Sequence, residues 1–199
     1  MDAFCSGDEF WNASQTWGET ATWPQFTECF QNTVLVWVAG GWLWLSSPFY
    51  MAYIASCKSN PLHNCWRSFA KLILTLILLA ICVVEFSWEA SDRLKQDKSL
   101  LEAAFMGPVV EAATLVLVII YVVLEKRKGF ITSGVLFIYW VLALLTFIIP
   151  FYTKIITQQY KDELLKVCLF YIYFGLTMCQ VVLYSFADSP PYTVHEILR

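Results

Sequence analysis

The chain has 199 residues, of which 58% are hydrophobic and only 15% are charged. An ordinary soluble domain is about 45–50% apolar and about 25% charged, and a chain of this size has too little interior to hide the excess. The composition therefore excludes a typical soluble fold, and the formal net charge of −3 argues against a nucleic-acid partner, which would favour a basic protein.

Residues 1–33 predict an N-terminal tail that precedes the first membrane helix. A cleavable signal peptide begins with a basic region followed by an apolar run, whereas residues 1–32 contain five acidic residues and no Lys or Arg. We therefore expect the first membrane helix to act as its own insertion signal.

Five apolar runs follow, and each approaches or exceeds the roughly 20 residues that a helix needs to cross a bilayer. They cover residues 34–55, 69–88, 103–124, 135–151 and 167–187, with Pro150 near the end of the fourth. Helices are expected because lipid-exposed backbone must satisfy its own hydrogen bonds. The pattern predicts an all-α membrane protein, with a five-helix bundle over residues 34–187 and the start of a cytoplasmic linker over residues 188–199.

The distribution of Lys and Arg predicts the orientation of the bundle, because basic loops stay in the cytoplasm. The tail has none, whereas the expected first and third loops carry Lys58, Arg67, Lys71, Lys126, Arg127 and Lys128. The expected second and fourth loops weaken this pattern, since they contain Arg93, Lys95, Lys98, Lys154, Lys161 and Lys166. We give most weight to the charges nearest the first helix, and therefore expect the N-terminus outside and the C-terminus in the cytoplasm.

On the outer side, Cys5 and Cys29 are candidates for a disulfide, with two free thiols as the alternative. Asn12, followed by Ala13 and Ser14, forms an N-glycosylation sequon in the same tail.

Cys57, His63 and Cys65 share the expected first loop, but three ligands at irregular spacing make a poor zinc site. Palmitoylation of a cysteine next to the membrane is the other possibility there. We therefore predict no metal site in the chain.

Glu85 and Glu111 lie within the second and third apolar runs, where an ionisable side chain costs roughly 2.5–3.5 kcal/mol and usually faces a partner or water. One hypothesis makes them part of a proton or substrate pathway. The other, favoured by their nearness to the ends of the runs, places Glu85 near the outer interface and gives Glu111 an interhelical hydrogen bond.

Small residues predict where helices approach closely. The candidates are Gly40 and Gly41, Ala52 with Ser56, Ala112 with Ala113, and Gly175 with Cys179.

Catalytic motifs are missing from the sequence. It has no phosphate-binding G-x-x-x-x-G-K-[ST] loop, no G-x-S-x-G and no H-E-x-x-H. We accordingly predict no catalytic residue and no cofactor for this chain.

Several segments resemble the multidrug resistance-associated proteins, which form subfamily C of the ATP-binding cassette exporters. They are Phe4-Cys5-Ser6, residues 26–38 beginning Phe26-Thr27-x-Cys29-Phe30, the run Leu124-Glu125-Lys126-Arg127-Lys128-Gly129, Phe170-Tyr171-Ile172-Tyr173-Phe174, and Phe186-x-Asp188-x-x-Pro191. The match covers nearly the whole chain, in order, and corresponds to the extra N-terminal five-helix domain of that family.

The resemblance implies an outside N-terminus, a pairing of Cys5 with Cys29, a glycan at Asn12, and an acid at the position of Glu85. It also implies that ATP and Mg²⁺ bind in a transporter core that lies outside this chain, and that intact relatives export organic anions and glutathione conjugates. The expected role is an accessory domain, most simply in the plasma membrane, that contacts lipids, the transporter core and trafficking partners. A stand-alone membrane adaptor and a small proton-linked carrier using Glu85 and Glu111 remain alternatives.

Overall fold

The computed structural model describes residues 5, 10–12, 16, 26–57, 66–96, 103–130, 133–156 and 164–186. Its elements are α2 (Glu28–Phe30), the π-helix η1 (Gln31–Leu35), and the long helices α3 (Val36–Ser56), α4 (Trp66–Gln96), α5 (Ala103–Lys128), α6 (Gly134–Ile156) and α7 (Leu164–Ser185). Five of the described helices, the first running from η1 into α3, are long and apolar enough to cross a membrane. The prediction of an all-α chain with five long apolar helices is confirmed for the described residues, while the side that each end faces is not determined by the fold.

The helices extend beyond the apolar runs, which corrects several expected loop positions. Arg67 and Lys71 lie in α4, and Lys154 lies in α6. Arg93 and Lys95 also belong to α4, and the basic triplet of residues 126–128 forms the last turn of α5. An apolar run ends where charged residues begin, but the helix continues into the membrane interface because its backbone hydrogen bonds are satisfied within the helix.

Prolines also sit inside these helices. Pro150, expected near the end of the fourth run, is followed by six further residues of α6, which ends at Ile156. Pro48 and Pro108 lie within α3 and α5. Membrane helices tolerate proline because neighbouring groups satisfy the freed carbonyl.

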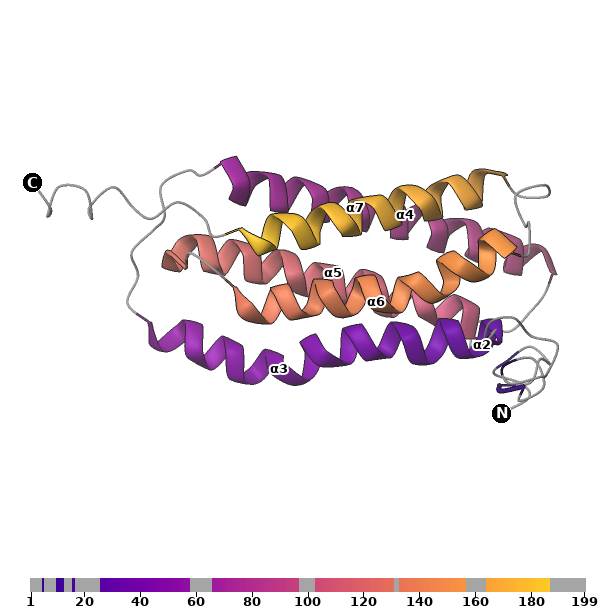
Figure 1. Ribbon diagram of the computed structural model, residues 1–199, viewed down its shortest axis with the longest axis horizontal. Helices are drawn as coiled ribbons and strands as arrows, with labels where there is room; N and C mark the ends of the chain where they lie inside the picture. The colour runs from indigo at the N-terminus through magenta and orange to yellow at the C-terminus, as the bar shows by residue number, and fades with distance from the viewer. Residues whose placement is uncertain are drawn as a thin grey trace, which may run out of the picture.

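The five long helices pack as a closed ring rather than in chain order. Around the ring the order is α3, α6, α7, α4 and α5, and α5 returns to α3. Helices that follow one another in the chain run in opposite directions (Figure 1). One end of the bundle therefore contains the starts of α3, α5 and α7 and the ends of α4 and α6. We call it the tail end, because α2 and η1 lie there.

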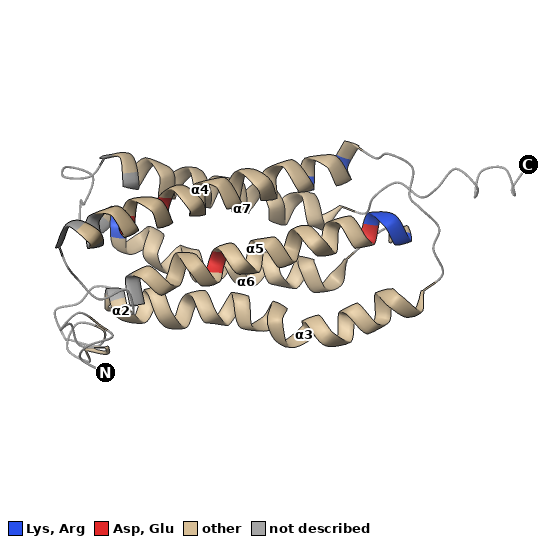
Figure 2. Ribbon diagram, turned by 180° about the vertical axis from the view of Figure 1, so that it is seen from behind, with Lys and Arg blue, Asp and Glu red and all other residues tan. Residues whose placement is uncertain are grey.

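Fully buried side chains fill the centre of the ring away from the tail end. Leu43, Leu78, Leu115 and Leu136 each have no exposed surface, and the indole of Trp140 is 1% exposed. They come from four different helices and form one continuous apolar core. Figure 2 shows that charged residues lie mainly toward the two ends of the bundle, with an acidic residue part-way along α5 as an exception.

Hydrogen bonds join α3 to α5 along one face of each helix. Trp44 Nε1 donates to Thr114 Oγ1 at 3.0 Å, and the hydroxyls of Ser47 and Tyr121 lie 2.5 Å apart. Tyr50 Oη donates to Glu125 Oε1 at 2.6 Å. Such bonds between membrane helices are worth roughly 0.6 kcal/mol each on average, so this series fixes the register of α3 against α5 more than it adds stability.

Candidate functional site

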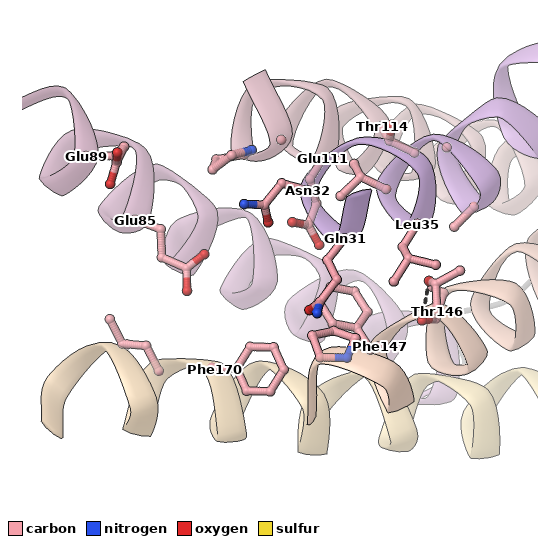
Figure 3. Close-up of a pocket in the computed structure, with 18 of the residues that line it drawn as sticks. Gln31, Asn32, Leu35, Glu85, Glu89, Glu111, Thr114, Thr146, Phe147 and Phe170 are labelled. Carbon is pink, nitrogen blue, oxygen red and sulfur yellow. Dashed lines mark hydrogen bonds between the residues drawn. The ribbon is translucent and has the colours of Figure 1, made fainter. Parts of the chain in front are cut away.

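A cavity of about 590 Å³ lies among the helices at the tail end of the bundle (Figure 3). Its walls come from η1 and from all five long helices, because the ring leaves its axis open there. In Figure 3 the side chains of Gln31, Glu85 and Phe170 project into the same space from three different helices. The cavity is therefore a product of the ring arrangement and not of any one segment.

Polar and charged side chains form one part of the wall. They are Gln31 and Asn32 from η1, Glu85 and Glu89 from α4, Glu111 from α5, and Lys154 from α6. Lys154 is near enough to Glu85 for a favourable electrostatic interaction. The Tyr173 hydroxyl of α7 is near enough to the Glu111 carboxylate to interact with it. The structure thus brings both sequence-predicted acids to one cavity and gives Glu111 a partner on another helix.

Aromatic side chains form another part of the wall. Trp88, Phe147 and Phe170 line it, and the Lys154 ammonium nitrogen lies 4.1 Å from the centre of the Phe170 ring. The fully buried Leu43 and Leu115 follow the lining residues Gly40 and Glu111 by about one helical turn. An apolar layer therefore closes the cavity on the side away from the tail end.

Irregular backbone shapes this end of the bundle. Pro150 lacks the N–H that would bond to the carbonyl of Thr146, and both residues line the cavity. Gly107 lets η1 approach α5, since a Cβ there would lie 3.3 Å from the Asn32 carbonyl oxygen. The π-helical turn η1 places Gln31 and Asn32 in the wall, and such turns are frequent at functional sites.

The N-terminal tail is attached beside η1. Cys5 and Cys29 are joined by a disulfide with a Cα–Cα distance of 5.5 Å. Thr27 Oγ1 donates to the Phe10 carbonyl oxygen at 2.6 Å, and the rings of Phe10 and Phe30 are 5.8 Å apart. These contacts tie the described part of the tail to the segment that begins the cavity wall.

Asn12 is half-buried, and its carbonyl accepts a hydrogen bond from Thr16 Oγ1 at 2.9 Å. The other two residues of its sequon lie outside the described residues. Glycosylation at this position stays a prediction.

At the opposite end, Lys126, Arg127 and Lys128 occupy the last turn of α5. Lys128 Nζ donates to the carbonyl oxygen of Cys57 at the end of α3, at 3.0 Å, while Arg127 is exposed. A cationic cluster also complements the partial negative charge of a helix C-terminus.

Sequence reasoning missed a polar cluster between α4 and α7. Gln180 is fully buried, and its Nε2 donates to the Lys71 carbonyl oxygen at 3.0 Å and to Thr75 Oγ1 at 2.9 Å. Lys71 is 6% exposed, and its ammonium lies 4.7 Å from the centre of the Tyr184 ring. A glutamine inside an apolar helix was the one available signal, and its partner on α4 could not be deduced from it.

The structure describes only part of the expected first loop, in which a zinc site or a palmitoylated cysteine was considered. No group of three or more His, Cys, Asp or Glu side chains able to hold a metal ion occurs among the described residues. Cys57 is a free thiol in the structure, whereas His63 and Cys65 lie outside the described part of the chain.

The small residues divide into packed and open positions. A Cβ at Gly40 would lie 3.2 Å from Thr114 Oγ1, whereas Cβ atoms at Gly41 and Gly175 would meet nothing within 4 Å. Cys179 is exposed. Only Gly40 of these therefore serves close packing within the bundle, and the face with Gly175 and Cys179 points outward.

A family model described as ABC transporter TMD0 domain matches residues 2–168. This chain belongs to the TMD0 domain family of ABC transporters. The TMD0 match covers the tail, the first four spanning helices and the start of the fifth.

Relatives in subfamily C match this TMD0 chain over nearly all of its length. ATP-binding cassette sub-family C member 3 of Mus musculus is 30% identical over 198 residues, which is 96% of this chain and 13% of that protein. The Homo sapiens member 3 is 29% identical over 199 residues, and member 2 of Mus musculus is 26% identical over 196 residues. The predicted resemblance to subfamily C is confirmed, and the chain spans about an eighth of the length of these relatives.

Proposed function

We propose that this TMD0 chain is the accessory N-terminal membrane domain of an ATP-dependent exporter of organic anions, glutathione conjugates or drugs. It would act in trafficking, retention and packing against the transporter core. The match of the TMD0 family model to residues 2–168 carries this proposal. ATP hydrolysis and substrate export would belong to the core.

One outward face of α7 supports the contact with a core. Leu165, Ile172, Gly175, Cys179 and Val182 are all exposed and recur at intervals of three, four or seven residues, so they share one side of the helix. The two small residues permit close approach of another membrane helix. Described residues of this chain do not cover that face, which suits it to pack against the core.

The proposed orientation places the tail end outside and the basic end of α5 in the cytoplasm. Its support is the charge of two segments at opposite ends of the bundle: the tail has no Lys or Arg, and residues 126–128 form a basic cluster at the end of α5. That cluster can also attract anionic lipid, at about 1 kcal/mol per charge. The plasma membrane is the proposed location.

Co-expression with a transporter core tests the accessory role. The partner would be the Mus musculus sub-family C member 3 without its segment matching this chain, and the measurement would be co-purification in mild detergent. We expect Gly175→Leu to reduce the recovered core roughly fivefold, the factor that corresponds to about 1 kcal/mol of lost helix packing. Gly41→Leu is the matched control, because it also adds a side chain to a helical glycine in open space.

Equal recovery with both variants would show that the α7 face is not the contact. A complete lack of association, together with saturable ATP binding by this chain alone, would contradict the accessory role itself. A stand-alone adaptor would associate with other proteins and leave the core behind.

One observation favours the alternative hypothesis of a proton-linked carrier, because Glu85 and Glu111 line the same cavity. A carrier also needs a route to the other side, and the buried layer with Leu43 and Leu115 blocks that route in this conformation. Proton-coupled flux in proteoliposomes that is lost in Glu111→Gln would establish it. The geometry favours a pocket that is closed on the side away from the tail end over a pathway through the bundle.

A further inference from the structure

We propose that the cavity at the tail end binds a small amphipathic cation, with its ammonium group beside Glu111 and Glu85 and its apolar body against Phe147 and Phe170. This goes beyond an accessory role, which requires no ligand of the domain's own. A volume of about 590 Å³ lies within the range of about 300–1,000 Å³ that is usual for small-molecule pockets.

The charge of the wall selects a cation. Three carboxylates and one ammonium line the cavity among the described residues. Lys154 offsets Glu85, whereas the group of α7 that interacts with Glu111 is the neutral hydroxyl of Tyr173. Glu85 and Glu111 also interact with each other electrostatically. A positive ligand group between them would relieve that repulsion and compensate the cost of holding a carboxylate inside a membrane protein.

The aromatic wall selects the same class of ligand. The Lys154 ammonium already lies against the Phe170 ring, 4.1 Å from its centre, so this wall accommodates a cation in the structure. Phe147 adds an apolar surface on the neighbouring helix. The Thr146 carbonyl, which lacks its usual helical donor because of Pro150, adds an acceptor close to the cavity.

Three probes with one apolar body test the charge preference: 4-phenylbutyltrimethylammonium, 4-phenylbutanol and 4-phenylbutanesulfonate. Binding to the 199-residue chain in phosphatidylcholine nanodiscs would be measured by equilibrium dialysis, with empty nanodiscs subtracted to remove partitioning. The permanent charge of the ammonium probe makes its protonation irrelevant. We expect saturable binding of the cation and at least roughly tenfold weaker binding of the alcohol and the sulfonate, since an interaction with a charged group is worth about the 1.4 kcal/mol that corresponds to a factor of ten.

Matched variants locate the site. Glu111→Gln and Glu85→Gln should each weaken binding of the cation roughly tenfold. Glu125→Gln removes the same charge from the other end of α5, where the carboxylate accepts from Tyr50 Oη, and should leave binding unchanged. As a second readout, the cation should raise the unfolding temperature of the unmodified chain and of Glu125→Gln but not that of Glu111→Gln.

Unchanged affinity in both cavity variants would overturn the proposal, as would equal binding of the cation and the alcohol. A preference for the sulfonate would overturn it as well, and would identify Lys154 as the dominant charge. If Glu111→Gln failed to fold, Glu85→Gln and the order of the three probes on the unmodified chain would still decide the question.

Discussion

Two adjacent glycines of α3 offer a sharp test of the helix packing. Gly40 faces α5, and a Cβ on it would lie 3.2 Å from Thr114 Oγ1 and 3.8 Å from Val110 Cγ1. Gly41 is turned by one residue, about 100° around the helix, and a Cβ there would meet nothing within 4 Å. Leucine at either position adds the same atoms to the same helix, so the difference between the two variants isolates the contact with α5.

The expected difference follows from how firmly the neighbour is held. Thr114 Oγ1 donates to the Val110 carbonyl at 2.7 Å and accepts from Trp44 Nε1 at 3.0 Å. It cannot move aside without breaking these bonds, and overpacking a well-filled site costs about 1–3 kcal/mol. We therefore expect Gly40→Leu to lower the free energy of unfolding by about 1–3 kcal/mol more than Gly41→Leu does.

The assay is unfolding of the detergent-solubilised chain by added sodium dodecyl sulfate, followed by tryptophan fluorescence and circular dichroism. Thr114→Ala should recover part of the loss in Gly40→Leu, because it removes the crowded hydroxyl, and a double-mutant cycle gives the coupling. Equal destabilisation by the two leucine variants, or no coupling to Thr114, would refute the assigned contact between α3 and α5.

Three further predictions concern the tail, the topology and the buried glutamine. With every cysteine outside the tail disulfide replaced, a cysteine at Trp11 should react with an impermeant reagent on intact cells and one at Lys128 should not; the reverse result would invert the proposed orientation. Non-reducing peptide mapping should find Cys29 joined to Cys5, a bridge that stabilises the tail by about 3 kcal/mol in the chain-entropy model; two free thiols would contradict this expectation. Glycosidase treatment should shift the gel mobility of the protein by removing a glycan from Asn12, and an unchanged mobility would contradict that prediction. Gln180→Met should change the free energy of unfolding by less than about 1 kcal/mol, because two lost interhelical bonds of roughly 0.6 kcal/mol each are offset by removing a buried amide oxygen that has no hydrogen-bond partner in the structure. Gln180→Ala should instead cost about 2 kcal/mol or more, because it leaves an empty space. Equal losses for the two variants in the sodium dodecyl sulfate assay would contradict that account.

The sequence alone determined the number of long apolar helices, the all-α class and the resemblance to subfamily C. These properties depend on features that are local in the sequence. An apolar run of sufficient length must be a helix in lipid, and motifs in a fixed order, such as the Glu125-to-Gly129 segment, identify relatives without knowledge of the fold. The helix ends were less well predicted. Lys71 and Lys154 were expected in loops, yet they lie in α4 and α6, because hydropathy marks the hydrocarbon core while backbone hydrogen bonding continues past it.

Only the tertiary structure decided which face of each helix turns inward. In a membrane the lipid-facing and core-facing sides are both apolar, so the hydrophobic pattern that orients a helix in a soluble protein is weak. The sequence therefore could not separate Gly40 from Gly41, or show that Gly175 faces outward. The ring order of the helices has the same origin, since it depends on side-chain fit between segments far apart in the chain. Glu85 and Glu111 could be named from the sequence, but the cavity that joins them exists only because that ring closes around them.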